Sequence, residues 1–90
     1  MSVIIKLHKM LQPYADDRET VEMEGDTVGE CLSRMVARYP EMEKELFRSR
    51  GKPYSFFDIH LNGESADPAG MEQHVSDGDE ISIEVFKPGA

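Results

Sequence analysis

The sequence is poor in cysteine and in aromatic residues. Its 90 residues include one cysteine and no tryptophan, and aromatic residues make up 8% of the chain. A single cysteine, Cys31, excludes an internal disulfide and favours a reducing compartment. The N-terminal segment "MSVIIKLHKML" lacks the long apolar run of a signal peptide or a membrane span. We therefore expect a cytoplasmic protein with no membrane partner.

Positive charge is also scarce. The chain has 10 lysine and arginine residues against 18 aspartate and glutamate residues, a formal net charge of -8. Such a surface repels the phosphate backbone, so nucleic acid is not expected as a partner. The same charge attracts a basic protein and speeds encounter with it.

The sequence lacks the motifs of an enzyme. A chain of this length predicts one domain over residues 1–90, with a modest core and little room for a deep cleft. It has no nucleophile motif and no glycine-rich phosphate loop. The three histidines, His8, His60 and His74, share no metal-ligand spacing. We expect a binding or carrier module with no intrinsic catalytic site, no metal and no bound cofactor.

Alternating apolar and polar residues predict several half-buried strands. The predicted strands cover residues 3–8, 20–24, 57–61 and 81–86, with a brief edge strand over residues 64–66. The first two strands form a hairpin across the polar segment "QPYADDR", which is expected to be a loop. Asn62 and Gly63 form a strong turn signal between the third strand and the brief edge strand.

Residues 28–39 change to helical periodicity, with apolar positions that lie on one face. Thr27 and Glu30 fit a capping box at the start of this helix, and Pro40 opposes its continuation. Cys31 lies beside the apolar stripe and is expected to be a buried structural thiol. A short second helix is predicted over residues 41–47, followed by an exposed basic loop, "RSRGKP".

The order of strand, strand, helix, strand, short strand and strand predicts an α+β roll. The helix should cover one face of a mixed sheet of four to five strands, with the first and last strands adjacent in its centre. Strand parity places Ile4 and Phe86 on the opposite face, and Phe56 joins them at the start of the third strand. These three residues are either scattered exposed apolar side chains or a partner patch, and the sequence leaves both readings open.

Three segments, "TVGECLSRMVARYPEM", "HLNGE" and "VSDGDEISI", resemble the small sulfur-carrier family in order and spacing. This ThiS/MoaD-like family includes the small subunit of molybdopterin synthase and the sulfur carrier of thiamine biosynthesis. The resemblance spans nearly the whole chain and implies the β-grasp, or ubiquitin-like, fold.

The resemblance also implies a reactive C-terminus. In that family an adenylating, ThiF/MoeB-like activating enzyme uses ATP to adenylate the terminal carboxylate, which then becomes a thiocarboxylate and delivers sulfur to a partner enzyme such as a large synthase subunit. Here Ala90 would carry the sulfur, and Lys87, Pro88 and Gly89 would form the tail arm. The family ends in Gly-Gly, whereas this chain ends in Gly-Ala.

Chain length and the long connection over residues 41–53 favour the molybdopterin branch over the thiamine branch. Two alternatives stay open at this point. One is a β-grasp interaction module that has no carrier role, and the other is a ubiquitin-like modifier that is joined to lysines.

Overall fold

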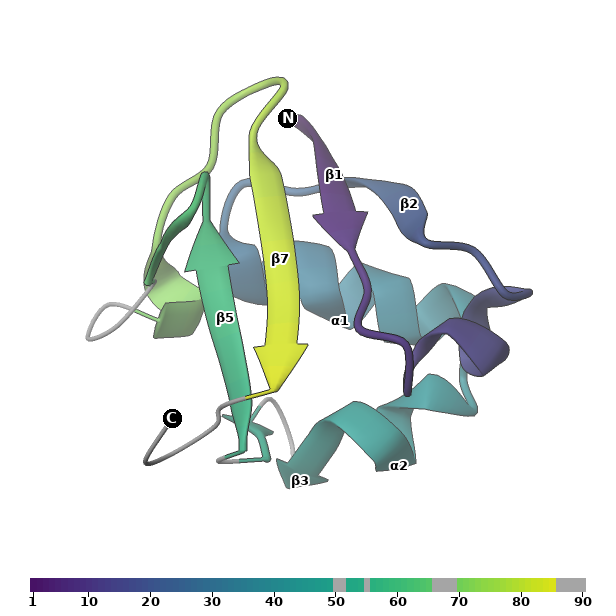
Figure 1. The fold of residues 1–90 in the computed structure, drawn as a ribbon. Helices are drawn as coiled ribbons and strands as arrows, with labels where there is room; N and C mark the ends of the chain where they lie inside the picture. The colour runs from purple at the N-terminus through teal and green to yellow at the C-terminus, as the bar shows by residue number, and fades with distance from the viewer. Residues whose placement is uncertain (50–51, 55, 66–69, 86–90) are drawn as a thin grey trace.

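The five-stranded mixed sheet of the fold has the order β2-β1-β7-β5-β6, with helix α1 against one face (Figure 1). The computed structural model describes residues 1–49, 52–54, 56–65 and 70–85. The strands of this sheet are β1 (Ser2–Lys6), β2 (Thr20–Glu24), β5 (Phe57–Leu61), β6 (Glu64–Ser65) and β7 (Glu80–Val85). Helix α1 (Val28–Arg38) follows β2 in the chain. This arrangement confirms the predicted α+β roll with the β-grasp fold.

The first and last strands lie side by side in the centre of the sheet, as the sequence predicted. β1 and β7 are parallel, with Ile5 opposite Ile81. β1 pairs with β2, and β7 with β5, in antiparallel fashion. Both central strands have a neighbour on each side, and one side of the sheet faces α1, so their alternate side chains are buried and are valine or isoleucine.

The N-terminus of α1 is capped as predicted, with one difference. The amide of Glu30 donates to the hydroxyl of Thr27 at 3.1 Å. The carboxylate of Glu30 accepts from the amide of Asp26 at 2.9 Å, one residue before the usual capping-box partner. The helix ends at Arg38, two residues before Pro40. Both ends therefore follow from the local sequence.

The core lies between α1 and the sheet. Leu32 and Met35 on the helix and Ile5 on β1 are fully buried, Val36 is 7% exposed, and Ile83 on β7 is 2% exposed. The core also includes Cys31 and Val75, and the partly buried Ile59 and Met71 pack against it. The predicted packing of the helix and the buried thiol are both confirmed.

The segment expected to be an exposed basic loop is instead part of a small hairpin, so this prediction was wrong. Helix α2 (Met42–Leu46) leads into β3 (Phe47–Ser49), which pairs with β4 (Lys52–Pro53). Phe47 is 9% exposed and packs in the core, and the amide of Tyr54 donates to the carbonyl of Leu46 at 3.0 Å. These two contacts hold the ends of the segment close together. The hairpin was not predicted because the residues between the two contacts are charged and have no strand pattern.

The segment "QPYADDR", which was expected to be a loop, contains the short 3-10 helix η1 (Gln12–Ala15), and a second one, η2 (Gly70–Glu72), lies before β7. The predicted turn at Asn62 and Gly63 is confirmed, since both residues have positive φ angles, 52° and 85°. The amide of Asn62 also donates to the carbonyl of Glu80 at 2.8 Å, which fixes the end of β5 against the start of β7. In the described part of the chain, no helix is long and apolar enough to cross a membrane.

Candidate functional site

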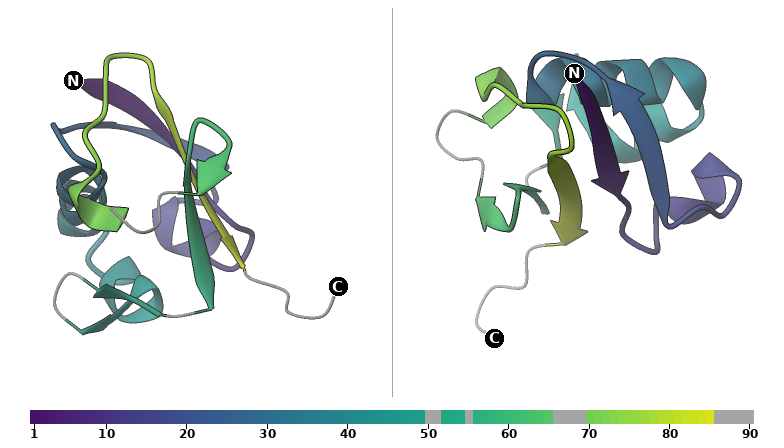
Figure 2. Two further views of the ribbon diagram at one scale, coloured as in Figure 1. Left: turned by 90° about the vertical axis from the view of Figure 1, so that its left-hand side faces the viewer. Right: turned by 90° about the horizontal axis from the view of Figure 1, so that it is seen from above.

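β7 is the last strand before the predicted sulfur-attachment site in the sequence. Its last residue, Val85, pairs with Phe57 of β5. The tail arm, Lys87, Pro88 and Gly89, the attachment residue Ala90 and the patch residue Phe86 all lie outside the described residues. The surface that can be described is therefore the face of the five-stranded sheet opposite α1, here called the open face. Figure 2 shows α1 and α2 together on the other side of the sheet.

Two predicted patch residues are exposed but lie far apart. Ile4 is 42% exposed and Phe56 is 41% exposed. Ile4 is level with Glu80 at the start of β7, whereas Phe57 is level with Val85 at its end. Five residues of strand span roughly 17 Å. Ile4 and Phe56 therefore do not form one apolar cluster, and a partner that contacts both must extend along β7.

Phe56 is held by its aromatic neighbours. Its ring stacks on Tyr54 with the centroids 5.3 Å apart, and it lies 4.6 Å from the ring of Phe57. Phe57 is buried, so it connects this exposed ring to the core. An aromatic side chain with few rotatable bonds and fixed neighbours can bury a large area against a partner at low entropic cost.

A cluster of three ionisable residues lies on the open face between the positions of Ile4 and Phe56. Nε2 of His60 on β5 lies 2.9 Å from Oδ2 of Asp58 and 3.7 Å from Oε2 of Glu84 on β7. The hydrogen bond that the protonated His60 ring donates to Asp58 raises the pKa of His60, and the charge of Glu84 raises it further. The alternation of residues 57–61 is consistent with this position of His60, but only the pairing of β5 with β7 brings Glu84 to it.

The rest of the open face is mainly acidic. Lys6 lies 3.8 Å from Glu80, and both side chains are about half exposed. Glu22 and Glu24 on β2 occupy exposed positions that alternate with buried ones. With five carboxylates against Lys6 and His60, the open face suits a basic partner surface.

The remaining candidate residues do not add a reactive centre to this face. Cys31 is a buried residue of α1, and burial raises the pKa of its thiol. His8 accepts a hydrogen bond from the amide of Met10, and His74 forms an isolated bridge with Thr27. Among the residues that the structure describes, no group of three or more histidine, cysteine, aspartate or glutamate side chains is placed to hold a metal ion.

Comparison with known proteins gives a consistent result across sequence and structure. The family model described as "ThiS family" matches residues 5–88. The sulfur carrier protein CysO of Mycobacterium tuberculosis is 29% identical over 86 residues, which cover 92% of each chain. Its crystal structure has a TM-score of 0.85 at 27% identity and covers 94% of this chain and 99% of that one.

Two further proteins extend the comparison. Small archaeal modifier protein 1 of Haloferax volcanii is 31% identical over 80 residues, which cover 87% of this chain and 88% of the relative. The crystal structure of the Amycolatopsis orientalis BexX/CysO complex gives a TM-score of 0.84 at 25% identity, with 98% of this chain and 99% of that one covered. The relatives are thus small carrier and modifier proteins rather than catalysts. The chain belongs to the ThiS family, and it shares its fold with these small carrier and modifier proteins.

Proposed function

We propose that this protein carries sulfur as a thiocarboxylate on the carboxyl group of Ala90. The observation that carries the proposal is the ThiS family match over residues 5–88, supported by the similarity to the sulfur carrier protein CysO along nearly the whole chain. β7 ends at Val85, so the reactive group would follow a central strand by only five residues.

The chemistry needs two steps, because a carboxylate is a poor electrophile. An activating enzyme first joins the Ala90 carboxylate to the α-phosphate of ATP, which forms an acyl-adenylate and releases pyrophosphate. A sulfur donor at the level of hydrosulfide then attacks the acyl carbon. The carbon–sulfur bond forms, the bond to the adenylate oxygen breaks, and AMP leaves. ATP is used by the activating enzyme and is not a cofactor of this chain.

Docking on the activating enzyme would use the open face. Phe56 supplies an exposed aromatic ring on a buried support, and Ile4 supplies a second apolar contact along β7. The carboxylates around them would steer a basic partner surface. The complex of BexX with the related CysO supports the expectation that such a chain acts through a protein partner.

The test is conversion of the purified chain in vitro. It would be incubated with an adenylating enzyme from the same source, ATP and sulfide, and followed by intact-mass spectrometry. We expect the mass change for replacement of one oxygen by sulfur, dependent on ATP. A chain extended by two serines after Ala90 is the matched control, since its own carboxylate is displaced from the family position. If no adenylating enzyme from that source forms an adenylate or adds sulfur, the carrier proposal fails.

A ubiquitin-like modifier is the second candidate, and the 31% identity to Small archaeal modifier protein 1 favours it. In this case the activated Ala90 carboxyl would form an amide with a lysine of another protein. Cleavage after Glu84 would then leave residues 85–90 attached to that lysine, and mass spectrometry of proteins from cells would detect the remnant. A non-carrier interaction module would give neither the remnant nor the thiocarboxylate.

Among carrier pathways we propose molybdopterin synthesis over thiamine synthesis, because the connection over residues 41–53 is long and contains α2 and the β3–β4 hairpin. Thiocarboxylated protein would be mixed with a large molybdopterin-synthase subunit or with a thiazole-forming synthase. Loss of sulfur only in the first mixture is expected. Loss only in the second would reverse the assignment.

A further inference from the structure

The outer edge of β2 carries backbone groups that are not used within the sheet. β2 is the terminal strand of the sheet and, within the part of the chain that the structure describes, pairs only with β1. The amide of Leu7 donates to the carbonyl of Glu19, and the amide of Gly25 donates to the carbonyl of Met1, each at 2.9 Å. In an antiparallel ladder, hydrogen-bonded pairs of residues alternate with pairs that are not hydrogen-bonded. Between the two hydrogen-bonded pairs just named, every second residue of β2 therefore directs its N–H and C=O away from β1. The outward groups belong to Thr20, Glu22 and Glu24.

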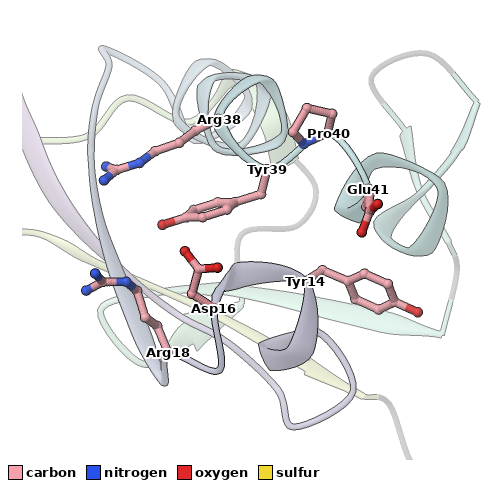
Figure 3. A pocket seen from close by; sticks show the side chains of 7 residues that line it. All are labelled: Tyr14, Asp16, Arg18, Arg38, Tyr39, Pro40 and Glu41. Carbon is pink, nitrogen blue, oxygen red and sulfur yellow. The ribbon is translucent and has the colours of Figure 1, made fainter.

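A pocket lies beside this edge, between η1 and the C-terminal end of α1 (Figure 3). Arg18, just before β2, and Arg38, the last residue of α1, both line it together with Tyr39. The same three residues also line a second pocket with Thr20 and Glu22, so the hollow continues onto the edge of β2. An extended segment that pairs with β2 would therefore pass these two guanidinium groups.

Both arginines are available to an acidic ligand group. Neither Arg18 nor Arg38 forms an ion pair with another described residue, whereas Lys6 and Arg34 each have one. The guanidinium of Arg38 lies 5.6 Å from the centroid of the Tyr39 ring. Figure 3 shows the two guanidinium groups at the same end of the pocket, with the carboxylate of Asp16 beside them and Glu41 at the other end. A carboxylate could therefore reach both cations from the β2 side.

The two sides of this edge differ in charge. Glu22 and Glu24 are exposed on the open face, whereas Arg38 and Tyr39 belong to the helix layer. A strand added to β2 directs alternate side chains to these two sides. A second copy of β2 would bring glutamates against glutamates on the open face, and like charges directly opposite each other are destabilising. The edge thus disfavours self-pairing.

We propose that the outer edge of β2 binds an extended segment of a partner protein by strand addition. The segment would place basic side chains opposite Glu22 and Glu24 and an acidic side chain toward Arg18 and Arg38. Backbone pairing would supply affinity, and the alternating charges would set register and specificity. β2 is two strands away from β7, so a partner held here leaves the end of β7 accessible. The proposal does not depend on thiocarboxylate chemistry.

The probe is the capped hexapeptide KVKDKV, whose lysines share one side of a strand while aspartate and the valines share the other. It would be titrated into isotopically labelled protein and followed by amide NMR shifts. We expect shifts along β2 and at Arg38, and weaker binding by KVKNKV. Two further peptides would be methylated on alternate backbone nitrogens, one at the odd positions and one at the even positions. Only one of these peptides loses the N–H groups that face β2, so only that peptide should fail to bind.

Two protein variants test the site itself. Glu22→Pro removes one outward N–H without removing a bond to β1, and it should abolish binding while Glu22→Ala does not. Arg38→Glu should weaken binding by about threefold to fivefold, and Lys44→Glu on α2 is its matched control. The thermal melt of each variant confirms folding, and the methylated peptides decide the matter if Glu22→Pro unfolds. Shifts confined to Ile4 and His60, or β2 shifts that follow protein concentration without peptide, would overturn the proposal.

Discussion

Nε2 of His60 lies 2.9 Å from Oδ2 of Asp58, two residues earlier on the same strand and on the same side of the sheet. Glu84 on the neighbouring strand adds a second carboxylate at 3.7 Å. Protonation of His60 therefore neutralises part of the acidic open face. The charge of this surface therefore depends on the protonation of His60, whose pKa is raised by Asp58.

The first prediction concerns pH. The pKa of His60 is raised above its ordinary value of 6.5, mainly by the hydrogen bond with Asp58, so the protonated form is favoured in the folded protein. The resulting stabilisation is fully present below the ordinary pKa and is lost as pH rises through the raised one. His60→Gln should therefore reduce stability more at acidic than at alkaline pH. Urea unfolding from about pH 5 to about pH 9 measures the difference.

Two carboxylate variants test the cause of this shift. Asp58→Asn should lower the pKa of His60, as followed by the NMR shifts of its ring protons. Glu84→Gln should lower it by less, because Glu84 is farther from the ring and is the smallest contributor to the shift. Equal effects of the two variants would contradict the assignment to Asp58.

The second prediction concerns the core. Leu32 is fully buried between α1 and the sheet, so Leu32→Ala should reduce the free energy of unfolding by about 2–5 kcal/mol. The exposed neighbour Ser33 is the control, and Ser33→Ala should change stability by no more than about 0.5 kcal/mol. Chemical denaturation of the two variants gives both numbers. A loss at Leu32 as small as that at Ser33 would contradict the packing.

The third prediction concerns a close contact between α1 and η2. A Cβ at Gly29 would lie 2.9 Å from the carbonyl oxygen of Met71 and 3.0 Å from its Cβ. Alanine normally stabilises a helix by about 1 kcal/mol relative to glycine. At Gly29 we expect the reverse, a loss of about 1–3 kcal/mol, because backbone must move. A thermal melt of Gly29→Ala that shows stabilisation would mean that η2 moves away without cost.

Periodicity was sufficient to predict the main fold. The period-two segments and the capped helix each depend on local interactions, and their order leaves few topologies. The β3–β4 hairpin was missed because Phe47 and Tyr54 hold it from its two ends, whereas the residues between them read as a charged loop. The separation of Ile4 from Phe56 could not be predicted either, since it depends on the register of both β1 and β5 with β7.

The fourth prediction follows from that separation. If an activating enzyme covers the open face, Phe56→Ala and Ile4→Ala should each weaken its binding, Phe56→Ala by about 1–2 kcal/mol or more. Because the two sites are roughly 17 Å apart along β7, the losses should add within about 0.5 kcal/mol in the double variant. Calorimetric titration with the enzyme measures both. Strong non-additivity would indicate that the two side chains act as one patch.

The last prediction concerns the terminal residue. The family pattern ends in Gly-Gly, and this chain ends in Gly-Ala, so Ala90 adds one methyl group next to the carboxylate that would be activated. In a pocket fitted to glycine, one methyl group is typically worth about 1–3 kcal/mol, or about 10–200-fold in catalytic efficiency. An activating enzyme that normally acts on Gly-Gly should therefore form the adenylate and thiocarboxylate of Ala90→Gly faster than those of the unchanged chain. An enzyme from this protein's own source should show little or no such preference, since its pocket must already accept alanine.

Rates of pyrophosphate release and of sulfur incorporation, measured for both proteins with both enzymes, give the comparison. Binding of the two proteins to each enzyme is the control, because the docking surface on the sheet is the same in both. If the own-source enzyme binds both proteins equally and activates only Ala90→Gly, then Ala90 blocks the carrier reaction, and the role of an interaction module is favoured instead.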